Sequence, residues 1–476
     1  MSLIEPKSKQ MSTSQLNRSL GLRLVVVVVI GNIIGSGVYK KVAPMTAELH
    51  SSGWVLICWI IAGIISLLGA LCNAEVAGLL ADTGGEYAYY QKIYNKFFAF
   101  LFGWSLFTVI QTAAISALAY VFAESLNSIM HFPALLPNLA DVSIAGVFYP
   151  FADLSVKLVA IILIILLTWI NTKGIKTGAG FSMTILLLVF ASIFMIIAFG
   201  LTSGASSFTR INMQTSPTNP VTVSSAFTAM LAAFWAYQGW ASVGYVGGEI
   251  KDAKRNLPRG LVIGMLAIIT LYLLVNTTYL TLLSIPQLED VYNSGNKIAA
   301  IEAVKTFWGQ GGALFISTLI AVTTLGCCNA TILTSCRTYF AMATQGLFFQ
   351  NATKLNEKQA PVNSLLAQGI WACILVLSGT FDQLTDMIIF AVFIYYGATT
   401  LGVFILRKKM PDAPRPYKVW GYPVIPAIVV LFCVALLLNT IFSRPREAAI
   451  GAALMLTGVP MYLWFTRKKR DITQGS

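Results

Sequence analysis

The segment GNIIGSGVY, residues 31–39, places glycine and serine in the middle of the first apolar stretch of the chain. Gly35 and Gly37, on either side of Ser36, favour an opened turn. An opened turn leaves backbone N–H and C=O groups without helical partners. The N–H groups can bind a carboxylate and the carbonyls an ammonium group or a metal ion, so the segment could hold both ends of a zwitterion. Close packing is the alternative, because Gly31 and Gly35 also form a G-x-x-x-G motif.

A second interruption falls in the apolar stretch of residues 222–246, which contains the sequence AAFWAYQGWASVGYVGGE. Trp235, Gln238 and Gly239 lie near its middle. The two interrupted stretches are the first and the sixth, as in a repeat of five helices plus five, and such a pair indicates a binding site at the bilayer midplane. Trp235 lies inside the stretch rather than at its rim, so it is either a lid over a bound molecule or an aromatic residue that faces lipid.

The composition is that of a protein embedded in lipid. Of the 476 residues, 57% are hydrophobic and only 11% are charged, and the mean hydropathy is +0.74. A soluble protein has about 25% charged residues, and its exterior could not accommodate this much apolar surface. This composition excludes a secreted disulfide scaffold, a disordered chain and a nucleic-acid-binding domain. We therefore expect the lipid bilayer as a partner and no nucleic acid.

Crossing the hydrocarbon core requires about 20 apolar residues in a helix, and twelve stretches of the chain meet this requirement. Because backbone groups in lipid must be hydrogen-bonded internally, the predicted fold class is an all-α polytopic membrane protein with 12 transmembrane helices. The stretches are residues 22–44, 54–76, 97–123, 156–172, 178–203, 222–246, 259–283, 312–344, 364–380, 384–406, 420–442 and 448–466.

The charged residues indicate the orientation of these helices. An even number of spans places both termini on one side. If that side is the cytoplasm, 24 of the 32 Lys and Arg residues are cytoplasmic and 8 are outside. The positive-inside rule therefore predicts a multi-pass protein of a plasma membrane with cytoplasmic tails at residues 1–20 and 467–476.

The middles of the predicted spans contain no Asp, Glu, Lys or Arg. A cationic substrate would need a buried carboxylate and an anionic substrate a buried arginine, so the side chain of the bound molecule is predicted to be uncharged. A membrane-embedded enzyme is an alternative class, but it would need a nucleophile, a metal cluster or an acid pair at membrane depth. Ser36 has no His or acidic residue near it in the sequence. We therefore predict no enzyme activity, no metal site and no organic cofactor.

Seven motifs carry a resemblance to a known family. They are GNIIGSGVY (31–39), TGGEYAYYQKIY (83–94), INTKG (170–174), FWAYQGW (234–240), GGEIKDAKRNLPRG (247–260), GCCNATILTSCRTYFAMATQG (326–346) and VFILRKKMPDAPRPYKV (403–419). With these motifs, in the family's order, the chain resembles the L-amino acid transporter family of the amino acid–polyamine–organocation superfamily. The resemblance extends from residue 19 to residue 469.

The resemblance implies two inverted repeats of five helices, helices 1–5 in residues 21–203 and helices 6–10 in residues 222–406. Helices 1 and 6 are unwound in this family. Two accessory helices follow in residues 420–466. The implied activity is secondary transport of neutral L-amino acids by alternating access, as an exchanger or an ion-coupled uptake system.

The resemblance also assigns site residues. The substrate carboxylate is expected on the backbone amides of Ser36 and Gly37. The ammonium group is expected on the carbonyls of Ile33, Trp235 and Ala236, with Trp235 in the place of the family's aromatic gate. Gly35, Gln238 and Gly239 complete the predicted substrate site.

Two departures from the family concern the coupling ion. The position of a lysine that is usual in helix 5 is Val189 here, and helix 8 has two adjacent hydroxyls, Thr323 and Thr324. Paired hydroxyls resemble the sodium site of related sodium-coupled transporters, and a hard cation suits two Thr hydroxyls with carbonyls near Asn32 and Gly35. The alternative is that the hydroxyls bond their own helix. A sodium-coupled symporter is therefore a second hypothesis, with Na⁺ as the coupling ion.

A third departure concerns protein partners. Eukaryotic members bind a heavy subunit through a cysteine in the loop after helix 3. Residues 124–154 contain no cysteine, so we expect no disulfide-linked heavy subunit. The expected location is a bacterial inner membrane.

Overall fold

The structure is a computed structural model that describes residues 21–80, 85–144, 148–173, 182–214, 219–241, 250–358 and 360–474. The predicted N-terminal tail, residues 1–20, lies outside this part of the chain. The described residues form helices and connecting turns, and an isolated antiparallel β-bridge joins Ile144 to Phe148. The predicted all-helical fold class is confirmed.

The first half of the chain forms the helices that carry the first interruption and its neighbours. The α-helices are α1 (Leu22–Ile33), α2 (Gly37–Lys40), α3 (Val42–Leu49), α4 (Ser52–Leu79), α5 (Gly85–Ile93), α6 (Lys96–Ser105), α7 (Gln111–Met130), α8 (Leu154–Thr172) and α9 (Ser182–Thr202). A π-helical turn, Leu106–Ile110, joins α6 to α7. Short 3₁₀ turns span Pro137–Leu139 and Phe208–Arg210.

The second half contains longer helices. They are α10 (Val223–Tyr237), α11 (Ala253–Leu282), α12 (Ile285–Asn293), α13 (Ala299–Thr344), α14 (Val362–Ser378), α15 (Phe381–Lys409), α16 (Val424–Ser443), α17 (Pro445–Leu456) and α18 (Gly458–Gln474). A 3₁₀ turn spans Gln350–Thr353. The helix α13 is bent at Gly309, where φ is +59°.

The apolar helices agree with the predicted membrane crossings. Within the described residues, eight helical segments are long and apolar enough to span a membrane, and four shorter apolar helices accompany them. Each of the twelve predicted stretches overlaps one of these segments. Large apolar side chains such as Phe194 (70% exposed), Ile162 (63%) and Phe442 (81%) face outward. Such a surface suits lipid, because a soluble monomer rarely exposes apolar patches of this extent.

The hydropathy pattern did not predict the helical residues between α11 and the membrane-spanning part of α13. The helix α12 and the first turns of α13 lie before residue 312, where the predicted span begins. The helix α12 starts at a capping box formed by Ser284 and Gln287. Because α12 is rich in polar residues, a search for apolar stretches does not detect it. The eighth predicted span is therefore the later part of a helix that begins earlier.

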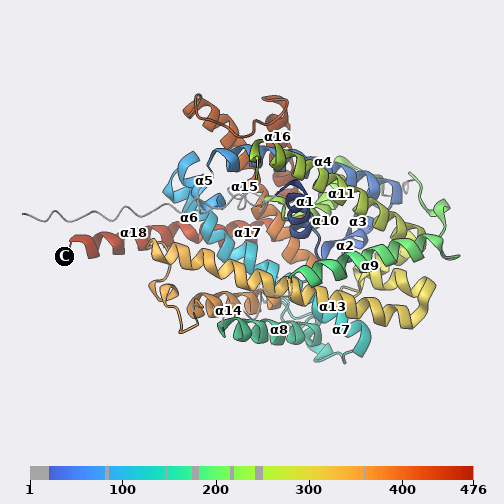
Figure 1. The fold of residues 1–476 in the computed structure, drawn as a ribbon. Coiled ribbons are helices and arrows are strands. Elements are labelled where there is room, and N and C mark those ends of the chain that lie inside the picture. The colour runs from blue at the N-terminus through green and yellow to red at the C-terminus, as the bar shows by residue number, and fades with distance from the viewer. Residues whose placement is uncertain are drawn as a thin grey trace, which may run out of the picture.

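The short helices of the two interrupted spans lie in the middle of the bundle. Figure 1 shows α1, α2 and α10 surrounded by longer helices, with α7, α8, α13 and α14 side by side along one flank. The helix α1 packs on α11, whereas α10 packs on both α3 and α4. The longer helices therefore enclose the two interruptions.

Candidate functional site

The first interruption lies between α1 and α2. The helix α1 ends at Ile33, Ile34 has an extended backbone (φ −69°, ψ 115°), and α2 begins at Gly37. The Ser36 hydroxyl is buried and has no hydrogen-bond partner among the described residues. No described atom lies within 4 Å of the position that a Cβ would take on Gly35. The predicted opening is present, with an unpartnered hydroxyl and open space beside it.

The second interruption follows α10. This helix ends at Tyr237, and Gln238 has an extended backbone (φ −63°, ψ 146°). Gly239 has a φ of +120°, in a region that residues with side chains rarely adopt. The Gln238 amide donates to the Trp235 carbonyl at 3.3 Å. The glycine thus lets the backbone turn away from the helix axis at the place that the sequence indicated.

The two interruptions touch each other. A Cβ on Gly37 would lie 2.7 Å from the Cα of Ala236, which is closer than side-chain and backbone atoms can approach. A Cβ on Gly239 would collide with the Asn32 carbonyl oxygen. Both approaches require glycine, so the residues that open the two helices also allow them to meet.

A tyrosine of α11 bridges the two breaks. The Tyr272 hydroxyl lies 3.0 Å from the Ala236 carbonyl oxygen and 3.4 Å from the Ile33 carbonyl oxygen. These two carbonyls belong to the set predicted for the substrate ammonium group. Each carbonyl oxygen has two lone pairs, so it can accept a second hydrogen bond. The sequence analysis did not predict a role for Tyr272. The only sign of it in the sequence is a hydroxyl group in the middle of an apolar stretch.

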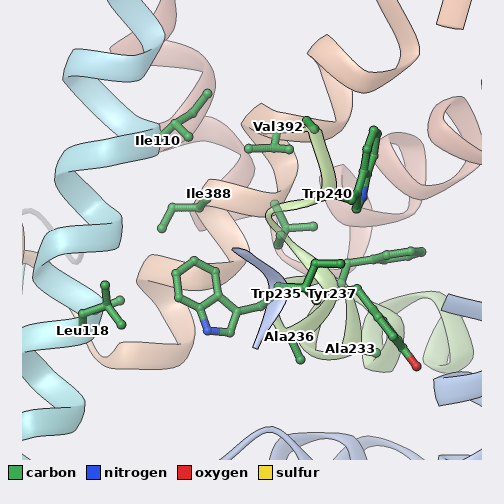
Figure 2. Close-up of a cluster of buried hydrophobic side chains, with 14 of the residues drawn as sticks. Ile110, Leu118, Ala233, Trp235, Ala236, Tyr237, Trp240, Ile388 and Val392 are labelled. Carbon is green, nitrogen blue, oxygen red and sulfur yellow. The ribbon is translucent and has the colours of Figure 1, made fainter. Parts of the chain in front are cut away.

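An apolar wall lies beside the breaks. In Figure 2 the Trp235 indole extends from α10 toward Leu118 of α7 and Ile388 of α15. Ile110 of the π-helical turn and Val392 of α15 lie above them in this view. Trp235 is only 9% exposed, so it does not face lipid, and the other alternative, a lid, fits its position. The π-helical turn Leu106–Ile110 contributes Ile110 to this wall, and such turns are frequent at functional sites.

Comparison with known families identifies the chain. A model of the amino acid permease family matches residues 20–466, which is nearly the whole chain. The chain belongs to this family. Membership confirms the resemblance described above, and the permease is an amino acid transporter of the multi-pass membrane class rather than an enzyme.

The permease is similar to characterised transporters over almost its full length. It is 30% identical to the serine/threonine exchanger SteT of Bacillus subtilis, over 95% of this chain and 98% of that protein. It is 26% identical to the b(0,+)-type amino acid transporter 1 of Mus musculus, with 97% and 91% covered. The large neutral amino acids transporter small subunit 2 of Mus musculus is 29% identical, with 94% and 81% covered.

The two hydroxyls predicted to bind an ion, those of Thr323 and Thr324, lie inside the helix α13. Thr323 and Thr324 are buried, and both donate to the Ile320 carbonyl, at 3.0 and 2.7 Å. This is the bonding of Thr hydroxyls to their own helix that formed the alternative. Val189 is buried in α9 and offers methyl groups where the family usually has a lysine. The sodium hypothesis therefore stays a prediction.

Proposed function

We propose that the permease exchanges neutral L-amino acids across a bacterial inner membrane by alternating access. The contact between the two interrupted helices carries this proposal. It brings the backbone of Gly37 against that of Ala236, so that groups of both chain breaks can bind the same small molecule. A zwitterion is the ligand whose two charges suit amide donors and carbonyl acceptors placed side by side.

The backbone groups have distinct roles in this proposal. The amides of Ser36 and Gly37 begin the helical segment formed by α2 and α3, where unpaired N–H groups and the helix dipole favour a carboxylate. The carbonyls of Ile33, Trp235 and Ala236 receive the ammonium group, which shares two of them with Tyr272. The open space beside Gly35 leaves room for the substrate α-carbon.

The side chain of the substrate meets apolar groups. Ile110, Leu118 and Ile388 are buried beside the Trp235 ring. The charged residues that follow the first interruption, Lys40 and Lys41, are paired with carboxylates of α7 and α15. An uncharged side chain is therefore the one that this wall accepts without burying an unpaired charge.

We further propose the two inverted repeats and the membrane orientation that the sequence predicts. We assign the Lys40–Glu124 pair to the outer side. We assign the Glu75–Arg407 pair to the cytoplasmic side, together with both termini. The helices α1 to α9 then form the first repeat, α10 to α15 the second, and α16 to α18 the accessory part.

Exchange in proteoliposomes tests this function. We expect labelled alanine, serine or leucine to enter only when the vesicles contain an unlabelled neutral amino acid. An exchanger must bind an internal substrate before its binding site can face the outside again. Labelled glutamate and lysine should not enter. Uptake that is equally fast into vesicles without amino acid would contradict exchange, and the absence of any neutral amino acid uptake would contradict the proposed substrate class.

The same vesicles test the alternative of sodium coupling. We expect the uptake rate to be the same when choline replaces sodium, because the bonds of Thr323 and Thr324 to the Ile320 carbonyl give their hydroxyls a structural role within the helix. If uptake falls in choline, sodium symport replaces exchange. The Thr323→Val/Thr324→Val variant should then lose the sodium dependence.

A further inference from the structure

Two lysines that follow the first interruption are buried and paired with different helices. The Lys40 ammonium lies 2.5 Å from Oε1 of Glu124 in α7, and the side chains are 5% and 0% exposed. The Lys41 ammonium, completely buried, lies 2.6 Å from Oδ1 of Asp382 in α15. It also donates to the Thr385 hydroxyl at 2.6 Å. Ion pairs thus connect the outer half of the first interrupted helix to α7 and to α15.

The preceding residue makes a third connection. The Tyr39 hydroxyl is buried and lies 2.6 Å from the Ser192 hydroxyl in α9. Successive residues of a helix point about 100° apart, so three consecutive side chains can reach three surrounding helices. The residues Tyr39, Lys40 and Lys41 therefore hold the outer half of the helix on three sides.

An aromatic side chain connects the lysines to the proposed substrate site. The ring centroid of Phe381 lies 4.9 Å from the Lys40 ammonium and 4.6 Å from the Lys41 ammonium. The same ring meets the Trp235 ring edge-on, with the centroids 6.1 Å apart. A movement of Trp235 when a substrate binds would therefore press on the residue that both ammonium groups contact.

The hydrogen bonding of Glu124 differs from that of Glu75, another buried carboxylate paired across helices. In the described part of the chain, Oε2 of Glu124 and the nearby Tyr120 hydroxyl are buried without a hydrogen-bond partner. By contrast, both carboxylate oxygens of Glu75 at the opposite end accept from Arg407, and one accepts from the Val419 amide. Buried polar atoms without partners regain hydrogen bonds when water enters. Oε2 of Glu124 thus has no donor among the described residues, whereas both oxygens of Glu75 accept hydrogen bonds.

We propose that Lys40, Lys41, Glu124 and Asp382 form an outer latch that closes the substrate pathway on the outer side. In the closed state the two pairs hold α2 and Lys41, the residue after it, against α7 and α15. In the outward-open state both pairs separate, and their charged groups meet water. The inference rests on the proposed transport function, and Phe381 links the latch to the site.

Thiol labelling from the outer side tests the latch. Ile388 lies in α15, about two helical turns after Phe381. It lies next to Trp235 in Figure 2 and is completely buried. We would introduce Ile388→Cys into a chain without its native cysteines and treat intact cells with a membrane-impermeant maleimide. Neutralising both pairs, with Lys40→Met/Glu124→Gln and Lys41→Met/Asp382→Asn, should raise the labelling rate at least about tenfold. A rate equal to that of the parent would overturn the proposal.

Two further variants separate the latch from a general loss of structure. Lys305→Met/Glu302→Gln removes a lysine–glutamate pair of similar length (2.6 Å) within α13, and it should leave the labelling rate unchanged. Lys40→Glu should raise the rate, and the reversed pair Lys40→Glu/Glu124→Lys should return it toward that of the parent. A reversed pair that labels as fast as Lys40→Glu would contradict a role of the charge pair. Labelling requires no substrate, so a failure of amino acid exchange would not be mistaken for a failure of the latch.

Discussion

We expect the Gly37→Val variant to lose amino acid transport while it remains folded and inserted in the membrane. A Cβ on Gly37 would stand 2.7 Å from Cα and 2.8 Å from Cβ of Ala236. Because backbone atoms cannot move aside as a flexible side chain can, the two interrupted helices must separate. The sites proposed for the substrate carboxylate and ammonium group would then no longer face one molecule. We expect substrate affinity to fall by at least about tenfold, or about 1.4 kcal/mol.

The measurement is binding of labelled leucine to purified protein, together with exchange in proteoliposomes. Gly311→Ala is the matched control, because no described atom lies within 4 Å of the added Cβ, and it should bind leucine as the parent does. Gly35→Ala also has room for the added Cβ, so it should fold normally and weaken leucine binding only through contact with the proposed substrate. Near-normal leucine affinity in Gly37→Val would count against the assigned site.

The second large effect is expected from Trp235→Ala. The indole covers the apolar wall and packs edge-on against Phe381, so its removal opens the site to water and takes away an apolar contact of the substrate. Buried aromatic rings contribute large contact areas. We expect kcat/KM for leucine exchange to fall by at least about tenfold, which corresponds to about 1.4 kcal/mol.

Trp235→Phe keeps an aromatic ring at this position, and we expect it to retain most of the leucine exchange rate. Size-exclusion chromatography of both variants would show whether the alanine variant remains folded, since truncation of a buried tryptophan costs about 3–5 kcal/mol. If folded Trp235→Ala exchanged leucine at the parental rate, Trp235 would have only a packing role.

The interruptions of the first and sixth spans were predictable because they have a local cause. Gly35, Gly37 and Gly239 stand in apolar stretches where a regular helix has no need of glycine. The structure opens both helices at these residues. The contact of Gly37 with Ala236 was not predictable, because it depends on how two distant segments pack.

The outer ion pairs show a second limit of sequence reasoning. Lys40 and Lys41 fall near the end of the first predicted span, and Glu124 falls just after the third. A hydropathy pattern treats such residues as the rim of a span and cannot identify a partner 84 residues away, as Glu124 is from Lys40. The helix α7 continues to Met130, so Glu124 is a buried helical residue rather than the start of a loop.

The most direct test of the account asks whether an amino acid occupies the junction of the two interruptions. The Ser36 hydroxyl is buried at this junction without a described partner, so a thiol in its place would report on occupancy. The measurement is the rate at which a small thiol reagent modifies Ser36→Cys in a chain whose seven native cysteines are replaced. We predict that saturating leucine or alanine slows the modification at least about tenfold, as expected for a site that is mostly occupied, and that glutamate does not. A modification rate that is unchanged by an amino acid which the same protein transports would contradict the account.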